Sequence, residues 1–278
     1  MNFKNFFDII KIEQTLFALP FAYIGIVLGG GTSLNIWIWV SVALFAAKTA
    51  SMCFNHAIAA KSNVMNPITA DRHIPAGIVD KKTVLVIGIC SSCLFVFSAW
   101  MINPLCFYLS FLAIFILIAY SFFKRFSATT HFYLGLIEAT APIGGYFAAT
   151  GYFDWFPIIP GAAIMFWLSG FEILCSTQTT QVTQDESFDK KLGRINTLIV
   201  SIICYALALT ALVFMGYFWL PVKIYYDKFY CVMLILVTVI FISQQLIIWL
   251  KSDDPKSLKY LFRLNKFVAP FIFAGILL

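Results

Sequence analysis

The chain has 278 residues, of which 61% are hydrophobic and 12% are charged, and its mean hydropathy is +0.89. A soluble domain is nearer half apolar and a quarter charged, so this composition excludes an ordinary soluble protein and predicts one that lies in a lipid bilayer. The formal net charge of +6 does not indicate a nucleic-acid partner, because the basic residues are spread among the segments between apolar runs.

Apolar runs of about the length that crosses a bilayer recur along the whole chain. They cover residues 16–30, 36–60, 84–101, 105–122, 132–150, 156–175, 197–220, 229–250 and 260–278. Several are short, which leaves seven or eight helices as alternatives. No linker or soluble domain separates them. The sequence therefore predicts an all-α fold, a polytopic membrane bundle of about nine transmembrane helices in a single domain over residues 1–278.

The segments between the runs alternate in charge. Lys and Arg gather before the first run and in segments 61–82, 124–125, 190–194 and 251–266, whereas the intervening segments hold few of them. An excess of basic residues marks the cytoplasmic side of a membrane protein. We therefore expect a multi-pass membrane protein whose N-terminus and basic segments lie in the cytoplasm.

A first polar segment, FNHAIAAKSNVMNPITADRHIPAG (residues 54–77), directly follows the second run. Helical positions i, i+4 and i+8 share a face, which here holds Asn55, Ala59 and Asn63. Arg72 follows in the predicted loop. Solvated polar residues at the end of a membrane helix would give the same pattern, so this segment alone leaves a binding site and a plain interface both open.

A second polar segment, TQDESFDKKLGR (residues 183–194), contains two carboxylates four residues apart, Asp185 and Asp189. On a helical turn they would share a face and could hold Mg²⁺, which takes oxygen ligands and commonly bridges to phosphates. Lys191 and Arg194 are then near enough to meet the remaining charge of a phosphate. The alternative is a charged cytoplasmic loop with ordinary ion pairs.

Further charges lie at the end of the fourth run and inside other runs. Lys124 and Arg125 end the fourth run, where basic residues commonly anchor a helix at the interface. Lys48, Glu138 and Glu172 would be costly facing lipid, so we expect them to face the bundle interior or a cavity. Together the clusters predict a site for an amphiphile, with its charged head at the cytoplasmic rim and its apolar tail in the bundle.

Five stretches carry a resemblance to a known family, in the order in which the family has them. They are IKIEQTLFALPFAYIG (10–25), the segment 54–77 with its Asn-Pro and Arg-His-x-Pro-x-Gly frame, YSFFKRF (120–126), QDESFDKKLG (184–193) and FRLNKFV (262–268). The sequence resembles the intramembrane aromatic prenyltransferases, the 4-hydroxybenzoate polyprenyltransferase family. Within that family it is most similar to the bacterial branch that serves ubiquinone and menaquinone synthesis.

The resemblance implies nine transmembrane helices around a central cavity capped on the cytoplasmic side. It also implies transfer of a polyprenyl group from polyprenyl diphosphate to an aromatic acceptor, 4-hydroxybenzoate or a naphthoate, with Mg²⁺ as cofactor. The implied metal ligands are Asn55, Asn63, Asp185 and Asp189, of which Asn55, Asp185 and Asp189 are also the implied catalytic residues. The implied diphosphate-binding residues are Arg72, Lys124, Arg125 and Lys191.

The family has two Asp-rich motifs, which the segments 54–77 and 184–193 resemble. The first of them departs from the family pattern. The family has aspartates at the positions that are Ala59 and Asn63 here, and Ile68 stands where relatives usually have a basic residue. The stretch 172–185 is also longer than usual. Either the second motif carries most of the metal binding, or this chain is a family member with altered or lost catalysis that binds lipid diphosphates. An unrelated transporter is a third hypothesis, although the sequence lacks the internal repeats and broken helices of that class.

Overall fold

The computed structural model describes residues 12–64, 80–123, 130–179, 192–218, 228–250 and 256–277. Within these ranges the chain is helical and contains no strand. The helices are α2 (Ile12–Leu28), α3 (Leu34–Val64), α4 (Lys81–Ile102), α5 (Pro104–Phe123), α6 (Thr130–Thr150), α7 (Ile158–Thr179), α9 (Arg194–Phe218), α10 (Lys228–Leu250) and α11 (Lys256–Leu277). Each corresponds in order to one predicted apolar run, which confirms the all-α prediction.

The helices α3, α4, α7, α9, α10 and α11 are long and apolar enough to cross a membrane, six within the described ranges. Several helices extend past the apolar runs that predicted them: α3 continues to Val64, α4 begins at Lys81 and α11 begins at Lys256. The apolar run marks the part of the helix that the hydrocarbon covers. Backbone hydrogen bonding continues beyond it, because Lys and Ala are good helix formers in water as well.

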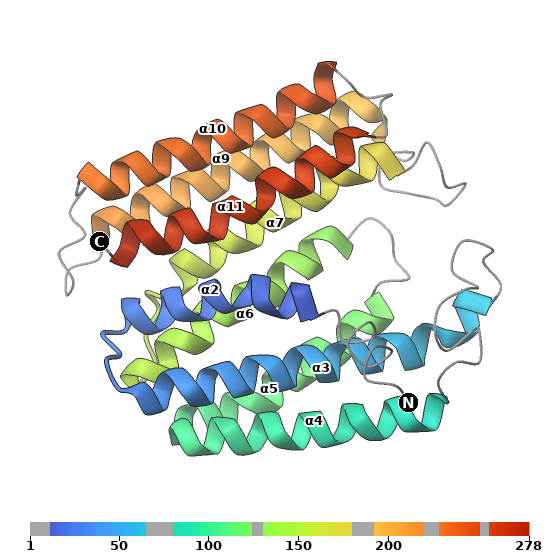
Figure 1. Ribbon diagram of the computed structural model, residues 1–278, viewed down its shortest axis with the longest axis vertical. Coiled ribbons are helices and arrows are strands. Elements are labelled where there is room, and N and C mark those ends of the chain that lie inside the picture. The colour runs from blue at the N-terminus through green and yellow to red at the C-terminus, as the bar shows by residue number, and fades with distance from the viewer. Residues whose placement is uncertain are drawn as a thin grey trace.

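The helices form two groups that lie side by side (Figure 1). One group contains α2 to α6, with α3 packed on α4 and α2 packed on α6, and the other contains α7 and α9 to α11. The contact between α6 and α7 joins them. The last turns of α3 and the first turns of α4, α9 and α11 lie at the same end of the bundle, on the right of Figure 1.

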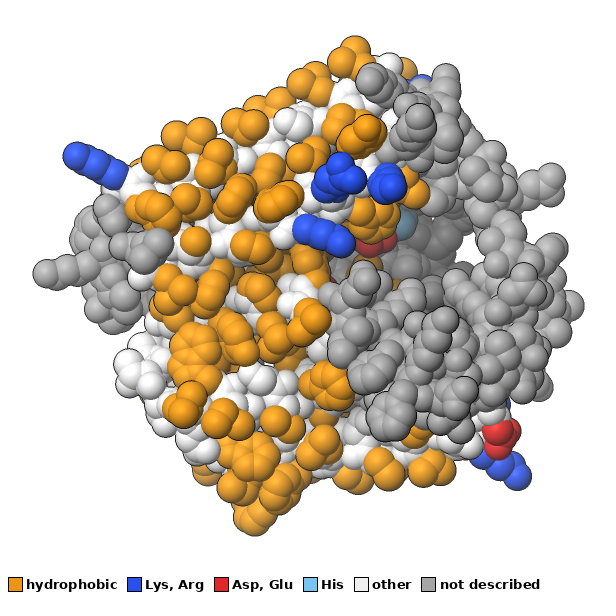
Figure 2. Space-filling model, viewed as in Figure 1, with side chains coloured by type: hydrophobic (Ala, Val, Ile, Leu, Met, Phe, Trp, Pro, Cys, Tyr) orange, Lys and Arg blue, Asp and Glu red, His pale blue; other side chains and the backbone are white. Residues whose placement is uncertain are grey.

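The surface in Figure 2 is mostly apolar, with basic side chains gathered near that same end. Lys81, Arg194, Lys259 and Arg263 are exposed there at helix starts, and Lys228 is exposed at the start of α10, which runs the opposite way. An apolar belt between polar ends is what a bilayer requires of a spanning protein. The protein is therefore a multi-pass membrane protein.

Small residues bring α2 and α6 into close contact. A Cβ atom added to Gly145 would overlap the carbonyl oxygen of Ala22, and one added to Gly25 would overlap the carbonyl oxygen of Pro142. Glycine at such a crossing lets two backbones approach, which is how membrane helices gain packing contacts. This contact holds α6 against α2 and so positions the α6 wall of the cavity described below.

Buried polar side chains connect the helices of the second group. The indole nitrogen of Trp167 donates to Asn265 Oδ1 over 3.0 Å, which links α7 to α11. The Tyr205 hydroxyl donates to Gln244 Oε1 over 2.6 Å, and the Gln244 amide donates to the Leu261 carbonyl over 3.4 Å. Hydrocarbon offers no hydrogen-bond partners, so such groups must find partners within the protein.

Candidate active site

A cavity of about 410 Å³ lies within the first helix group. Its wall comes from α3, α4, α5 and α6, one residue of α2 and the connection between α6 and α7. Most lining residues are apolar, and the polar ones are Lys48, Ser110, Glu138, Thr140 and Asp154. The hydroxyls of Ser110 and Thr140 already donate to carbonyls of their own helices, each over 2.6 Å. The charged groups therefore dominate the chemistry of the cavity.

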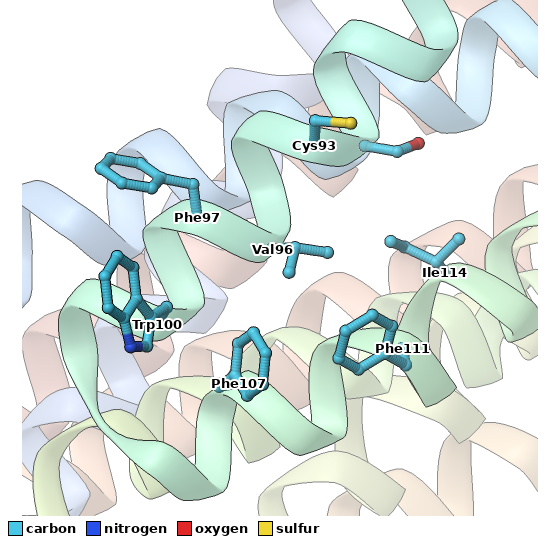
Figure 3. Close-up of a pocket in the computed structure, with 8 residues that line it drawn as sticks. Cys93, Val96, Phe97, Trp100, Phe107, Phe111 and Ile114 are labelled. Carbon is cyan, nitrogen blue, oxygen red and sulfur yellow. The ribbon is translucent and has the colours of Figure 1, made fainter.

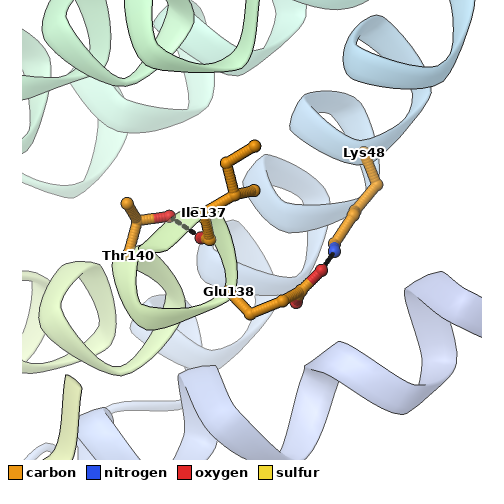
Figure 4. Close-up of polar contacts among 4 residues, drawn as sticks. All are labelled: Lys48, Ile137, Glu138 and Thr140. Atoms are coloured by element: carbon orange, nitrogen blue, oxygen red, sulfur yellow. Dashed lines mark hydrogen bonds and ion pairs between the residues drawn. The ribbon is translucent and has the colours of Figure 1, made fainter. Parts of the chain in front are cut away.

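Lys48 of α3 and Glu138 of α6 form an ion pair in the wall of this cavity (Figure 4). Their side chains are only 12% and 13% exposed. This confirms the prediction that both charges face the interior rather than lipid. Lys48 Nζ donates to Glu138 Oε1, while the buried Oε2 atom has no hydrogen-bond partner among the described residues.

Asp154 lies at the far end of the cavity, in the connection between α6 and α7. The Tyr146 hydroxyl donates to Asp154 Oδ2 over 2.9 Å and the Phe156 amide donates to Oδ1 over 3.3 Å. The hydrogen bond from Tyr146 is the main reason that the pKa of Asp154 lies below its usual range, and the hydrogen bond from the Phe156 amide lowers it further. The Phe153 ring of this connection stacks on Phe147 at 5.6 Å, and both rings line the cavity.

Asn55 lies two turns beyond Lys48 on α3, roughly 10 Å along the axis at 1.5 Å per residue. Its Oδ1 atom is buried and accepts no hydrogen bond from the described residues. A buried amide oxygen without a donor is costly, and it is the type of ligand that a hard cation takes. Because α3 runs to Val64, the predicted helical spacing of Asn55, Ala59 and Asn63 is confirmed for the backbone.

The other predicted site residues lie outside the described residues, so their arrangement stays a prediction. They are Arg72, Lys124, Arg125, Asp185, Asp189 and Lys191; for Asn63 the helix is described but the side chain is not. Where the structure does describe side chains, no three His, Cys, Asp or Glu residues gather in a cluster that could hold a metal ion.

Two tyrosines outside the cavity lining connect α5 and α6. The rings of Tyr120 and Tyr133 stack at 6.0 Å, and the Tyr133 hydroxyl donates to the Ile116 carbonyl over 3.1 Å. Glu172 of α7 is half-buried, as expected for a charge that avoids lipid. The sequence indicated the charged residues of the cavity wall only by their position inside apolar runs. It did not predict that Lys48 pairs with Glu138.

A second depression lies between α4 and α5 (Figure 3). It is an open groove of about 480 Å³ lined by Ser92, Cys93, Val96, Phe97, Trp100, Phe107, Phe111 and Ile114. The Ser92 hydroxyl donates to the Gly88 carbonyl over 2.9 Å, and the lining contains no charged residue. It therefore offers nothing that could hold a diphosphate, and we do not count it as part of the active site.

The membrane helices enclose a mostly apolar cavity with charged side chains in its wall. Such a cavity suits a ligand that is part polar and part apolar. The chain belongs to the UbiA prenyltransferase family, whose sequence pattern matches residues 18–267. A sequence comparison with curated proteins gives no match.

Solved structures share the fold over nearly the whole chain. A UbiA homologue from Aeropyrum pernix K1, in its apo form, has 26% identity and a TM-score of 0.83, covering 95% of this chain and 97% of its own. A digeranylgeranylglyceryl phosphate synthase has 16% identity and a TM-score of 0.76, covering 99% of both chains. A UbiA homologue from Archaeoglobus fulgidus bound to GPP and Mg²⁺ has 18% identity and a TM-score of 0.70, covering 99% and 100%.

Proposed function

We propose that this protein transfers a polyprenyl group from a polyprenyl diphosphate to an aromatic acceptor, 4-hydroxybenzoate or a naphthoate, in quinone biosynthesis. The observation that carries the proposal is the cavity, whose lining is mostly apolar and whose ion pair lies two turns along α3 from Asn55, the Oδ1 atom of which is buried with no hydrogen-bond partner among the described residues. An amphiphile with a polar head and an isoprenoid tail fits this distribution. The A. fulgidus relative was solved with such a diphosphate and Mg²⁺.

The donor head would bind at the end of the bundle where α3 ends and α4, α9 and α11 begin, which we place in the cytoplasm of a bacterial cell. Asn55 fits as a Mg²⁺ ligand, because its buried Oδ1 has no donor among the described residues and hard cations take neutral oxygen ligands. Asn63, Asp185 and Asp189 would complete the metal site, and when bound Mg²⁺ neutralises charge on the diphosphate. The predicted diphosphate-binding residues are Arg72, Lys124, Arg125 and Lys191.

The reaction exchanges one bond to the allylic carbon for another. The bond from that carbon to the diphosphate oxygen breaks and the diphosphate takes the electron pair, while a ring carbon of the acceptor bonds to the allylic carbon. The ring carbon then loses its proton to the released diphosphate, which restores aromaticity. The mostly apolar wall of the cavity excludes water that would capture the positive charge.

One observation favours a second candidate function. Alanine cannot ligate a metal, and Ala59 stands one turn from Asn55 where the family has an aspartate. A site short of negative charge could bind a lipid diphosphate without transferring its prenyl group. This candidate and the transferase differ in turnover rather than in binding.

The test is transfer activity in membranes that contain the protein, with polyprenyl diphosphate, Mg²⁺ and each acceptor in turn. We expect Asp185→Ala and Asp189→Ala each to lower turnover by at least about 100-fold, comparable to losing one electrostatic contact to a transition state. Asp80→Ala is the matched control, because Asp80 is exposed before α4 and its side chain makes no capping hydrogen bond.

Near-normal turnover in both aspartate variants would contradict the metal assignment. A folded wild-type protein that transfers to none of the acceptors, yet binds the diphosphate, would favour the second candidate.

A further inference from the structure

The carboxylate of Glu138 is only half satisfied in the structure. Oε1 accepts from Lys48 Nζ, and Oε2 is buried without a hydrogen-bond partner among the described residues (Figure 4). A carboxylate that is ion-paired with an ammonium group only accepts hydrogen bonds, so the missing partner must be a donor. Leaving such a group unmet is costly, and each case of this kind calls for a physical reason.

A purely structural role explains only one of the two oxygens. Helices α3 and α6 pack sparsely on each other, and the ion pair ties them together. That tie uses Oε1. The neighbouring hydroxyls of the wall cannot serve Oε2, because those of Ser110 and Thr140 already donate to the carbonyls of Phe107 and Ile137. No described residue donates to Oε2, and Glu138 lines the cavity, so a ligand in the cavity is in a position to supply the donor.

Resting on the function proposed above, we propose that Glu138 Oε2 accepts a hydrogen bond from the hydroxyl group of the acceptor substrate, and that Lys48 positions the carboxylate for this contact. The pair lies roughly 10 Å below Asn55 along α3, so the acceptor ring lies beneath the diphosphate head and beside the isoprenoid tail. The ligand class is a phenol or naphthol with a free hydroxyl.

This contact also bears on reactivity and specificity. A hydrogen bond from a phenol to a carboxylate is charge-assisted, and it draws the proton away from the ring oxygen. The ring carbons gain electron density and become better nucleophiles for the allylic carbon. A site built to bind a substrate hydroxyl also rejects the analogue that lacks it, because the protein group is then left without its partner.

The experiment measures binding alone, by isothermal titration calorimetry on the full chain in detergent with Mg²⁺ and inorganic diphosphate. The probes are two matched pairs, 4-hydroxybenzoate with 4-methoxybenzoate and 6-hydroxy-2-naphthoate with 6-methoxy-2-naphthoate. We expect the wild type to bind the hydroxyl member of at least one pair roughly 10- to 100-fold more tightly, the range of one hydrogen bond to a charged group.

The decisive variant is Lys48→Met/Glu138→Leu, which removes both charges and so leaves no unpaired ion in the cavity. We expect it to bind both members of each pair with equal affinity. Thr140→Val is the control, because it removes a hydroxyl from the same wall whose hydrogen is already donated to the Ile137 carbonyl. It should keep the preference of the wild type. If the double variant does not fold, Lys48→Met/Glu138→Met, which also removes both charges and keeps an unbranched side chain at position 138, takes its place.

Equal affinities for both pairs in the wild type would overturn the proposal, and so would a preference that survives in the double variant. Because neither donor nor turnover is needed, the outcome is independent of the transfer assay. A wild type that discriminates but transfers nothing contradicts the proposed function and leaves the Glu138 contact standing.

Discussion

Two neighbouring glycines of α6 provide a sharp test of the packing, Gly145→Ala against Gly144→Ala. A Cβ atom at Gly145 would overlap the Ala22 carbonyl oxygen and lie 3.0 Å from its carbon and 3.2 Å from the Ile26 nitrogen. These are backbone atoms of α2, which cannot rotate away as the end of a flexible side chain could. A Cβ at Gly144 meets no atom within 4 Å.

The magnitude follows from two opposing effects. Replacing a helical glycine with alanine stabilises a helix by about 0.5–1 kcal/mol in either position. Overpacking costs about 1–3 kcal/mol, and because the atoms met at Gly145 are backbone atoms we take the upper part of that range, about 2–3 kcal/mol, which leaves a net destabilisation of about 1–2.5 kcal/mol. At about 2–4 °C per kcal/mol for a chain of this size, Gly145→Ala should lower Tm by about 2–10 °C and Gly144→Ala should raise it by about 1–4 °C.

The assay is thermal unfolding in one detergent, followed by tryptophan fluorescence, since the chain has 7 Trp. Both variants change the same residue type on the same helix, so differences in propensity cancel between them. If Gly145→Ala were as stable as Gly144→Ala, the close approach of α2 and α6 would be refuted.

Two further predictions concern the site and its orientation. Ala59→Asp restores a carboxylate one turn from Asn55, so the Mg²⁺ concentration for half-maximal transfer should fall; an unchanged requirement with reduced turnover would show that the added charge repels the diphosphate instead. In a background that lacks the 7 native cysteines, Ser187→Cys should resist a membrane-impermeant thiol reagent added to intact cells, because basic segments stay in the cytoplasm. Tyr152→Cys, at an exposed position between α6 and α7, should react. Labelling at position 187 would show that this segment lies outside the cell and would contradict the predicted orientation.

The helices were predictable because the relevant rule is local. A stretch of apolar residues long enough to cross hydrocarbon must form a helix that satisfies its own backbone, whatever the other helices do. Helix ends were less predictable: α3 runs past the predicted limit at Ala60 to Val64, and α11 begins before Tyr260. Outside the hydrocarbon, helix propensity and not apolarity decides where a helix stops.

The candidate site was likewise predictable only where it depends on residues close together in the sequence. Sequence spacing predicted that Asn55, Ala59 and Asn63 share a helical face, and the cost of charge in lipid predicted that Lys48 and Glu138 point inward. It did not predict that these two pair with each other, because they are 90 residues apart and their meeting depends on how α3 and α6 are placed. The structure alone revealed that one side-chain oxygen each of Asn55 and Glu138 is buried without a hydrogen-bond partner in the described part of the chain.

The sequence by itself thus determined the membrane class and the order of the helices, since both depend on residues within a few turns of one another. The residues expected to serve a diphosphate and a metal stay a prediction. The tertiary structure alone decided which helices touch, where the cavity lies and which charges neutralise each other. The physical reason is that these features depend on backbone approach at contacts such as Gly145 with Ala22, which set the distance between helices far apart in the chain.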